Sequence, residues 1–460
     1  MPKKLINKKT KNKKPVMKTK KEISFEKKNN TPRANHSYDR LLGFRDISAA
    51  EYHNWQIIMD MVRKMARIYS FDQIEVPVLE NYELYNKLLA KGSSSLMKEV
   101  YQIIGANGEK IALRPNLFFG MMRSVFEQNI EEEGPIRLFS LGPVFRQSKL
   151  QSGNYRQATN FNLLILNEKK AMAESMLILL AYNFFRGLGI DVQIQINSIG
   201  DKVAQKEYLH RLVDYYKERG KRSKLCAECK KHLAKNPLAL LDCQEKECLD
   251  IRQDAPQITN YLSDESRDYF TKVLEYLDEL GVNYNFDPYL IKDFNVYNDT
   301  VFEVWPISSE GRNQAKYFLG AGGRCNQAWS HISGIESYAV DFTFDLERVL
   351  NKLKEKRMEA EKDKDIVFVA QLSDQAKIRS MAIFQELLEA GYQVRQSFTV
   401  DSLKAQLEKA KKMEARITLI MGKKEYMDDT ILFRDMESGV QESVPQKKIL
   451  NKVGKLINNK

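Results

Sequence analysis

The sequence predicts an α+β protein in which helices flank a mainly antiparallel sheet, followed by a small α/β domain at the C-terminus. Between about residues 72 and 324, apolar runs typical of strands follow one another without the regular alternation of βαβ units, which favours antiparallel pairing. Beyond residue 364 strands and helices do alternate, so the sheet there should be largely parallel. The charged run 355–365 is the expected linker.

The folded part of the chain should begin with a helix. From about Ala49 to Tyr69, apolar side chains recur at spacings of three and four residues, as they do on one face of a helix. Segment 71–80 alternates apolar and polar residues and contains Pro77, which predicts an edge strand. A turn at Asn107-Gly108 indicates a hairpin, and a helix is expected around Met121 to Phe126.

The remaining strands and helices follow from the same patterns. Strands are expected at 136–145, 161–166, 192–201, 300–305, 317–324, 366–371, 392–398 and 417–422. Helices are expected at 170–188, 206–216, 344–353, 378–391 and 402–415. The predicted domains are a disordered tail at 1–36, a core formed by 37–201 and 276–356, an insertion with little core at 202–275, and a C-terminal domain at 364–460.

Composition is that of an ordinary globular protein, with 43% hydrophobic and 29% charged residues among 460. No apolar run approaches the ~20 residues that a membrane span needs. The N-terminus is rich in lysine but has no apolar segment of the kind that a secretory signal requires. These observations predict a cytoplasmic protein with no membrane partner.

The net charge of +12 is concentrated in the N-terminal tail. Residues 1–30 hold twelve lysines and two glutamates, so the rest of the chain carries only +2. A tail of this composition should be disordered. It could add salt-sensitive, non-specific affinity for RNA, or it could be a solvated segment without a defined partner. The charge of the folded part does not by itself indicate RNA binding.

The segment Gly142–Gln157 is the most informative motif. Arg146 follows an apolar run, a polar loop with Gly153 comes next, and Arg156 precedes a second apolar run. This order predicts a strand, a loop and a strand, with a guanidinium group suited to bidentate binding of a phosphate or carboxylate. An ordinary hairpin with a salt-bridged arginine is the alternative for the segment taken alone.

The motif resembles motif 2 of the class II aminoacyl-tRNA synthetases, and most closely that of the histidyl group. Other segments match in the same order: the long helix and proline-bearing strand resemble motif 1, and Leu346-Glu347-Arg348 resembles motif 3. Gly43–Ile47 and the glycine run before Arg324 also resemble histidyl signatures, and the C-terminal part resembles the anticodon-binding domain. The resemblance covers about residues 40–453.

This resemblance implies a class II catalytic core, a homodimer, and ATP-dependent activation of histidine followed by its transfer to tRNA. Arg146 would bind the α-phosphate and the carboxylate, Arg348 the γ-phosphate, and Lys292 the developing pentavalent phosphorus. Arg156 would help to bind ATP, and Mg²⁺ would accompany it. The amino-acid pocket would be formed by Asn116, Asn160, Leu164, Tyr297, Gly322 and Gly323, with Tyr297 facing the imidazole.

Several of these positions depart from the family pattern. Asn116 and Leu164 stand where the family has glutamates that bind the ammonium and the imidazole of histidine. Lys292 replaces the catalytic arginine, Phe118 a small hydroxyl residue, and Asp345 a glycine. The alternative is therefore a catalytically silent relative that binds tRNA or a protein. The regulatory subunit of ATP phosphoribosyltransferase is such a relative, but it lacks the C-terminal domain. A ligase with a different amino-acid substrate is a third reading.

Four cysteines lie close together in the insertion. Cys226, Cys229, Cys243 and Cys248 form a C-x2-C pair and a C-x4-C pair, a spacing that suits a tetrahedral Zn²⁺ site. Free structural thiols are the alternative, and disulfides are disfavoured in a cytosolic chain. His232 is either a substitute ligand or a surface histidine.

Overall fold

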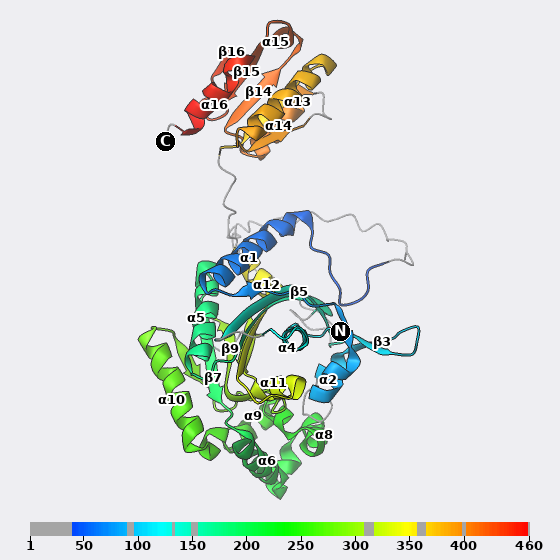
Figure 1. Ribbon diagram of the computed structural model, residues 1–460, viewed down its shortest axis with the longest axis vertical. Helices are drawn as coiled ribbons and strands as arrows, with labels where there is room; N and C mark the ends of the chain where they lie inside the picture. The colour runs from blue at the N-terminus through cyan, green and yellow to red at the C-terminus, as the bar shows by residue number, and fades with distance from the viewer. Residues whose placement is uncertain are drawn as a thin grey trace, which may run out of the picture.

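The computed structural model describes two separately folded parts, the core and the C-terminal domain (Figure 1). The described residues are 39–89, 96–130, 134–148, 155–307, 317–356, 365–397 and 402–458. The lysine-rich tail, Gly153 and most of the expected linker lie outside these residues. Among the described helices, none is long and apolar enough to cross a membrane.

The expected first helix is confirmed as α1 (Ala49–Ile68), but the strand expected at 71–80 is not continuous. It is divided into β1 (Asp72–Gln73), which pairs with the large sheet, and β2 (Leu79–Asn81), which pairs with a three-stranded sheet. Pro77 between them has no N–H to donate, and the carbonyl group of Val76 accepts a hydrogen bond from Arg114. The backbone therefore leaves one sheet and enters another.

The small sheet contains the expected hairpin. Its strand order is β2-β4-β3, with β3 at Tyr101–Ile104 and β4 at Lys110–Leu113. Gly108 in the turn has φ +82°, a conformation that favours glycine. The helices of this region are α2 (Tyr82–Leu89), α3 (Leu96–Glu99) and α4 (Phe118–Glu127).

The large sheet has eight strands in the order β1-β5-β6-β11-β10-β9-β7-β8. Only the two outer pairs, β1 with β5 and β7 with β8, are parallel, so the prediction of a mainly antiparallel sheet is confirmed. Its remaining strands are β5 (Ile136–Phe145), β6 (Gln157–Leu166), β7 (Val192–Ser198), β8 (Tyr284–Phe286), β9 (Asn298–Pro306), β10 (Gly320–Arg324) and β11 (Ala339–Asp345).

Strand β11 was not expected from the sequence, and the helix predicted at 344–353 begins later. Phe344 and Asp345 are the last residues of β11, and α12 runs over Leu346–Lys356. The change occurs at Asp345 because its Oδ1 atom accepts a hydrogen bond from the backbone N–H of Arg348 at 3.1 Å. A carboxylate in this position caps the first turn of a helix.

Different helices cover the two faces of the large sheet (Figure 1). Apolar residues of α1, α12, α5 (Met172–Gly187) and α10 (Asp264–Glu279) pack on one face in a single core cluster. The other face packs against α2, α4 and α11 (Asn326–Ser333). Side chains alternate between the two faces along a strand, so the polar residues of β6 and β11 lie together on the second face.

The insertion has a larger apolar core than the sequence suggested. Its elements are α6 (Lys202–Lys217), α7 (Arg219–Lys224), α8 (Ala227–Lys235), η1 (Pro237–Leu240), α9 (Lys246–Arg252) and η2 (Ile258–Tyr261). Tyr208, Leu212 and Tyr216 on α6 are buried against leucines of α8 and η1. The thiol groups are therefore not the sole source of cohesion in this segment.

The C-terminal domain has a five-stranded sheet in the order β13-β12-β14-β15-β16. Strands β12 (Val367–Gln371), β13 (Val394–Gln396) and β14 (Ile417–Met421) are parallel, as predicted. The hairpin of β15 (Thr430–Asp435) and β16 (Gln441–Pro445) was not predicted and is antiparallel. The helices are α13 (Asp374–Glu389), α14 (Leu403–Lys412), α15 (Lys423–Met427) and α16 (Ile449–Asn458), with a short η3 (Gln446–Lys448).

Candidate functional site

A cavity of about 210 Å³ lies between the polar face of the large sheet and α4. Its wall contains residues from several distant segments of the chain. The polar and charged ones are Asn116, Arg146, Asn160, Asp293, Tyr297, Thr343, Asp345 and Arg348. The structure thus brings together five of the residues that the sequence singled out for the site: Arg146, Arg348, Asn116, Asn160 and Tyr297.

Arg146 is held in the cavity wall by backbone contacts on both sides. It directly follows β5, and its Nε atom donates a hydrogen bond to the carbonyl group of Pro115 at 2.7 Å. Its backbone N–H donates to the carbonyl group of Arg156 at 2.9 Å. Burial lowers the pKa of the guanidinium, and the nearby carboxylate of Asp345 opposes this shift. The result is an oriented, partly buried cation in the cavity wall.

Arg348 is positioned by Phe318 and Asp345. Its Nη1 atom donates to the carbonyl group of Phe318 at 2.9 Å, and the guanidinium lies 4.7 Å from the centre of the Phe318 ring. Its Nε atom lies 3.1 Å from Oδ2 of Asp345. Burial raises the pKa of Asp345, while Arg348 and then Arg146 act against this shift. Two arginines therefore share one carboxylate at this end of the cavity.

Lys292 is not part of the cavity wall. Its Nζ atom forms an ion pair with Glu303, and the ammonium lies 5.1 Å from the centre of the Phe318 ring. The other carboxylate oxygen of Glu303 accepts a hydrogen bond from the indole N–H of Trp305 at 3.0 Å. Phe318 lines the cavity, so the ammonium group of Lys292 lies against a side chain of the cavity wall without being part of that wall.

Asn116 and Leu164 supply no carboxylate, as the sequence indicated. The Oδ1 atom of Asn116 accepts a long hydrogen bond of 3.4 Å from the backbone of Phe119. Its buried Nδ2 atom makes no hydrogen bond within the described part of the chain. Leu164 is fully buried in the core beneath α4 and is not among the residues of the cavity wall.

The glycines of β10 do not line the cavity, and their neighbouring strands also require them. We expected the bare backbone at Gly322 and Gly323 to let a ligand approach. Instead, a Cβ atom at Gly322 would lie 2.1 Å from the carbonyl oxygen of Asp341, and one at Gly323 would lie 2.6 Å from that of Thr300. The neighbouring strands require these glycines, and the residue of β10 in the cavity wall is Ala321.

Arg156 also lies elsewhere. Its Nη1 atom donates to the carbonyl group of Leu42 at 3.4 Å, and its backbone N–H donates to that of Gly43 at 2.8 Å. It therefore holds the N-terminal segment against the start of β6 and is not among the residues of the cavity wall.

Sequence reasoning missed Asp293 and Thr343, which line the cavity, and on the same face of the sheet it missed Asp341. The side chain of Asp341 is 1% exposed, and burial raises its pKa to about 7 against the opposing effect of the Tyr297 side chain. The segment from Val340 to Asp345 alternates apolar and polar residues, the pattern of a strand with two distinct faces. That alternation could have identified both β11 and its row of polar side chains.

The buried carboxyl groups predict a pH-dependent stability. Burial raises the pKa of Asp341 and of Glu347 to about 7, above their values in the unfolded chain. The folded protein keeps these protons where the unfolded chain releases them, so the free energy of unfolding should fall as the pH rises from about 4 to about 7. Asp341→Asn should weaken this fall and stabilise the protein at pH 8 more than at pH 5. Urea unfolding at both pH values measures the effect; the exposed control Asp72→Asn should behave as wild type, and identical pH profiles for all three proteins would contradict the prediction.

The four cysteines of the insertion meet in one cluster. Their Sγ atoms all lie within 4.8 Å of one another, and Cys226 and Cys243 are 3.9 Å apart. Tetrahedral Zn²⁺ with Zn–S bonds of about 2.3 Å places its sulfur ligands about 3.8 Å apart. The arrangement therefore fits a zinc ion with little adjustment. His232 is not a member of this cluster.

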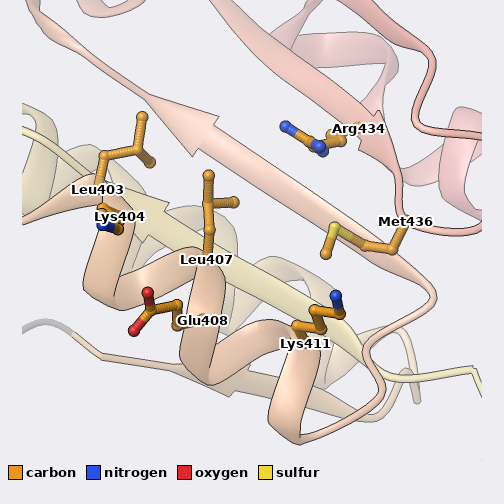
Figure 2. Close-up of a pocket in the computed structure, with 7 residues that line it drawn as sticks. All are labelled: Leu403, Lys404, Leu407, Glu408, Lys411, Arg434 and Met436. Carbon is orange, nitrogen blue, oxygen red and sulfur yellow. The ribbon is translucent and has the colours of Figure 1, made fainter.

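A second hollow, of about 400 Å³, lies in the C-terminal domain between α14 and β15 (Figure 2). Its apolar residues are Leu403, Leu407 and Met436. Three cationic residues, Lys404, Lys411 and Arg434, and one acidic residue, Glu408, complete its lining. The three cationic side chains make the rim of this hollow suitable for contact with phosphate groups.

Comparisons with known proteins agree along the whole described chain. Residues 43–349 match the family model described as histidyl-tRNA synthetase, and residues 366–456 match one described as an anticodon binding domain. The chain is 31% identical over 407 residues to the histidine–tRNA ligase of Thermosipho melanesiensis, covering 88% of this chain and 95% of that protein. It is 30% identical over 406 residues to that of Bacillus subtilis, covering 87% and 95%.

Two solved structures show the same fold. The apo histidyl-tRNA synthetase of S. aureus has a TM-score of 0.73 at 23% identity and covers 90% of this chain and 99% of that one. A Bacillus halodurans structure titled ATP phosphoribosyltransferase regulatory subunit/histidyl-tRNA synthetase has a TM-score of 0.60 at 17% identity, covering 85% and 99%.

Proposed function

Because the chain belongs to the histidyl-tRNA synthetase family, we propose that it activates histidine with ATP and transfers the histidyl group to tRNA. The observation that carries this proposal is the presence of Arg146 and Arg348 in the wall of one cavity with Tyr297. Oriented cations stabilise the charge that develops on a phosphate during nucleophilic attack. They also hold the reacting groups in line.

Each residue has a defined part in this mechanism. Arg146 binds the α-phosphate and the carboxylate of histidine, which brings the nucleophile to the phosphorus. Arg348 binds the γ-phosphate and stabilises the leaving pyrophosphate. Asp293 and Asp345 are the carboxylates of the cavity wall that would hold a Mg²⁺ ion bound with the triphosphate, since Mg²⁺ is commonly held by one or two carboxylates together with substrate phosphates. Lys292 assists if its ammonium leaves Glu303.

We further propose that the protein is a cytoplasmic homodimer whose C-terminal domain binds tRNA, and that the insertion holds a structural zinc ion. The family description of the C-terminal domain and its basic hollow support the binding of tRNA by that domain, and the dimer rests on the resemblance of the N-terminal helix and strand to motif 1. The mutual distances of the four thiols support the zinc ion. Charging of a tRNA(His) transcript with labelled histidine tests the overall reaction. If folded protein charges no tRNA, the proposed ligase function is contradicted.

A catalytically silent, tRNA-binding protein is the second candidate. The observation that favours it is the engagement of the site's cations by carboxylates of the protein itself: Lys292 by Glu303 and Arg348 by Asp345. A protein of this kind would bind tRNA but form no adenylate.

Removing the cations of the C-terminal hollow should weaken tRNA binding. The double variant Lys404→Ala/Lys411→Ala removes two phosphate-binding charges, and two such contacts change the slope of log K against log[salt] by roughly 1.5. Filter binding of tRNA from 50 to 200 mM salt measures both affinity and slope. Lys423→Ala/Lys424→Ala on α15 is the matched control, because it removes the same charge away from the hollow. Equal slopes for the two double variants would show that RNA binds elsewhere.

A further inference from the structure

The strand register places one buried carboxylate, Asp341, beside Leu164, the position where this chain lacks the carboxylate of its family. In the pairing of β6 with β11, Asp341 lies directly opposite Leu164, and Asp345 lies opposite Asn160. Residues that are directly opposite in an antiparallel pair share a face of the sheet. Thr343 and Asp345, two and four residues further along β11, both line the cavity. Asp341 therefore lies on the cavity face of β11, two residues beyond the part of the strand that lines the cavity.

The contacts of Asp341 leave one of its oxygens available. Its Oδ2 atom is 3.4 Å from Nδ2 of Asn162, an amide that makes a shorter contact of 2.6 Å with the Thr343 hydroxyl. Its Oδ1 atom accepts no hydrogen bond of normal geometry from the described residues. The side chain of Tyr297, which lines the cavity, lies close enough to favour the charged form of this carboxylate and so to lower its pKa. A buried oxygen in this state calls for a partner.

We propose that Asp341 is the specificity residue of the amino-acid pocket and accepts a hydrogen bond from the N–H of the histidine imidazole. This inference rests on the proposed binding of histidine in the cavity. The imidazole would pass Tyr297 and reach Oδ1 of Asp341, so the carboxylate that β6 lacks at Leu164 is provided by the neighbouring strand at the directly paired position. The pocket therefore keeps one carboxylate at the strand position paired with Leu164, and with it the selectivity for a ligand that donates an N–H.

The residues around Asp341 support this role over a purely structural one. A buried carboxylate without a compensating partner costs stability, and an aliphatic residue would pack on a strand at no such cost. Within the described chain no arginine or lysine forms a salt bridge with Asp341, although the charge of Lys292 acts on it from a distance. Its polar contacts come from neutral groups, the Asn162 amide and the side chains of Tyr297 and Thr343, so its charge has no salt-bridge partner. A buried carboxylate of this kind next to a cavity is a candidate for a ligand-binding position.

Direct binding measurements test the inference separately from catalysis. Histidine and a non-hydrolysable ATP analogue would be titrated calorimetrically into the wild type, Asp341→Asn, and the exposed control Asp72→Asn. Asp341→Asn keeps the shape and an acceptor oxygen but removes the charge, and replacing a charged acceptor by a neutral one should weaken histidine binding roughly 5- to 10-fold. Binding of the ATP analogue should stay within about twofold, which shows that the variant is folded.

A second variant returns the carboxylate to β6. Leu164→Glu combined with Asp341→Asn should recover a large part of the histidine affinity, a result that a structural role for Asp341 does not produce. Unchanged histidine binding in Asp341→Asn overturns the inference, as does a wild type that binds the ATP analogue but no histidine at millimolar concentration. The two proposals can fail separately. If the wild type binds histidine more tightly than Asp341→Asn does but forms no adenylate, the inference is supported and the proposed catalysis is contradicted.

Discussion

Replacing Arg146 by alanine should abolish amino-acid activation. The guanidinium lines the cavity and is oriented through Pro115, so it can bind the α-phosphate without reorganisation. Loss of one preorganised group of this kind lowers kcat by about 10²- to 10³-fold, and the loss of two bonds from a bidentate fork places Arg146→Ala at the upper end. Steady-state kinetics of ATP–pyrophosphate exchange would measure kcat and KM separately.

The matched control for this prediction is Arg137→Ala. Arg137 lies on the same strand, β5, but does not line the cavity. Its variant should retain exchange activity within about threefold, since substitutions away from special features have small effects. If Arg146→Ala and Arg137→Ala have similar activity, the cavity is not where ATP reacts.

Removing one thiol from the cysteine cluster should release the zinc ion and loosen the insertion. Purified protein is expected to contain about one zinc per chain, and Cys229→Ser should contain almost none, because a tetrahedral structural site needs its four ligands. The free energy of metal binding contributes to folding, so the melting temperature should fall and the segment 226–252 should become sensitive to protease. Elemental analysis and limited proteolysis measure the two effects.

The apolar core of the insertion limits the extent of this change. Tyr208 and Leu212 of α6 remain packed without the metal, so α6 should stay protected from protease. Cys325→Ser, at a buried cysteine outside the cluster, should keep its zinc. A wild type without zinc whose four clustered thiols react quickly with a thiol reagent would show that the cluster is a set of free thiols.

The elements that the sequence predicted correctly were those with a regular local pattern. The apolar stripe of α1, the Asn-Gly turn between β3 and β4, and the strand–helix alternation of the C-terminal domain are all local signals. The break in the strand expected at 71–80 depends instead on Arg114, which is distant in sequence and binds the carbonyl group of Val76. Local patterns carry no information on such a contact.

The site was predictable as a set of residues and less so as a geometry. Motif order placed Arg146 and Arg348 in one cavity, but it did not show that Asp345 would pair with Arg348 or that Glu303 would pair with Lys292. The glycines of β10 were linked to ligand approach, whereas the neighbouring strands account for them. Asp341 was not predicted because its signal is the alternation of polar and apolar residues along β11, whereas the family resemblance points to positions on β6.

The most direct test of the account is histidine-dependent exchange of pyrophosphate into ATP by the purified full-length protein with Mg²⁺, with each of the other amino acids as a control. The account predicts exchange with histidine and none with amino acids whose side chains lack an N–H donor. No exchange with any amino acid, from folded protein that still binds tRNA, would contradict it and would establish the catalytically silent alternative.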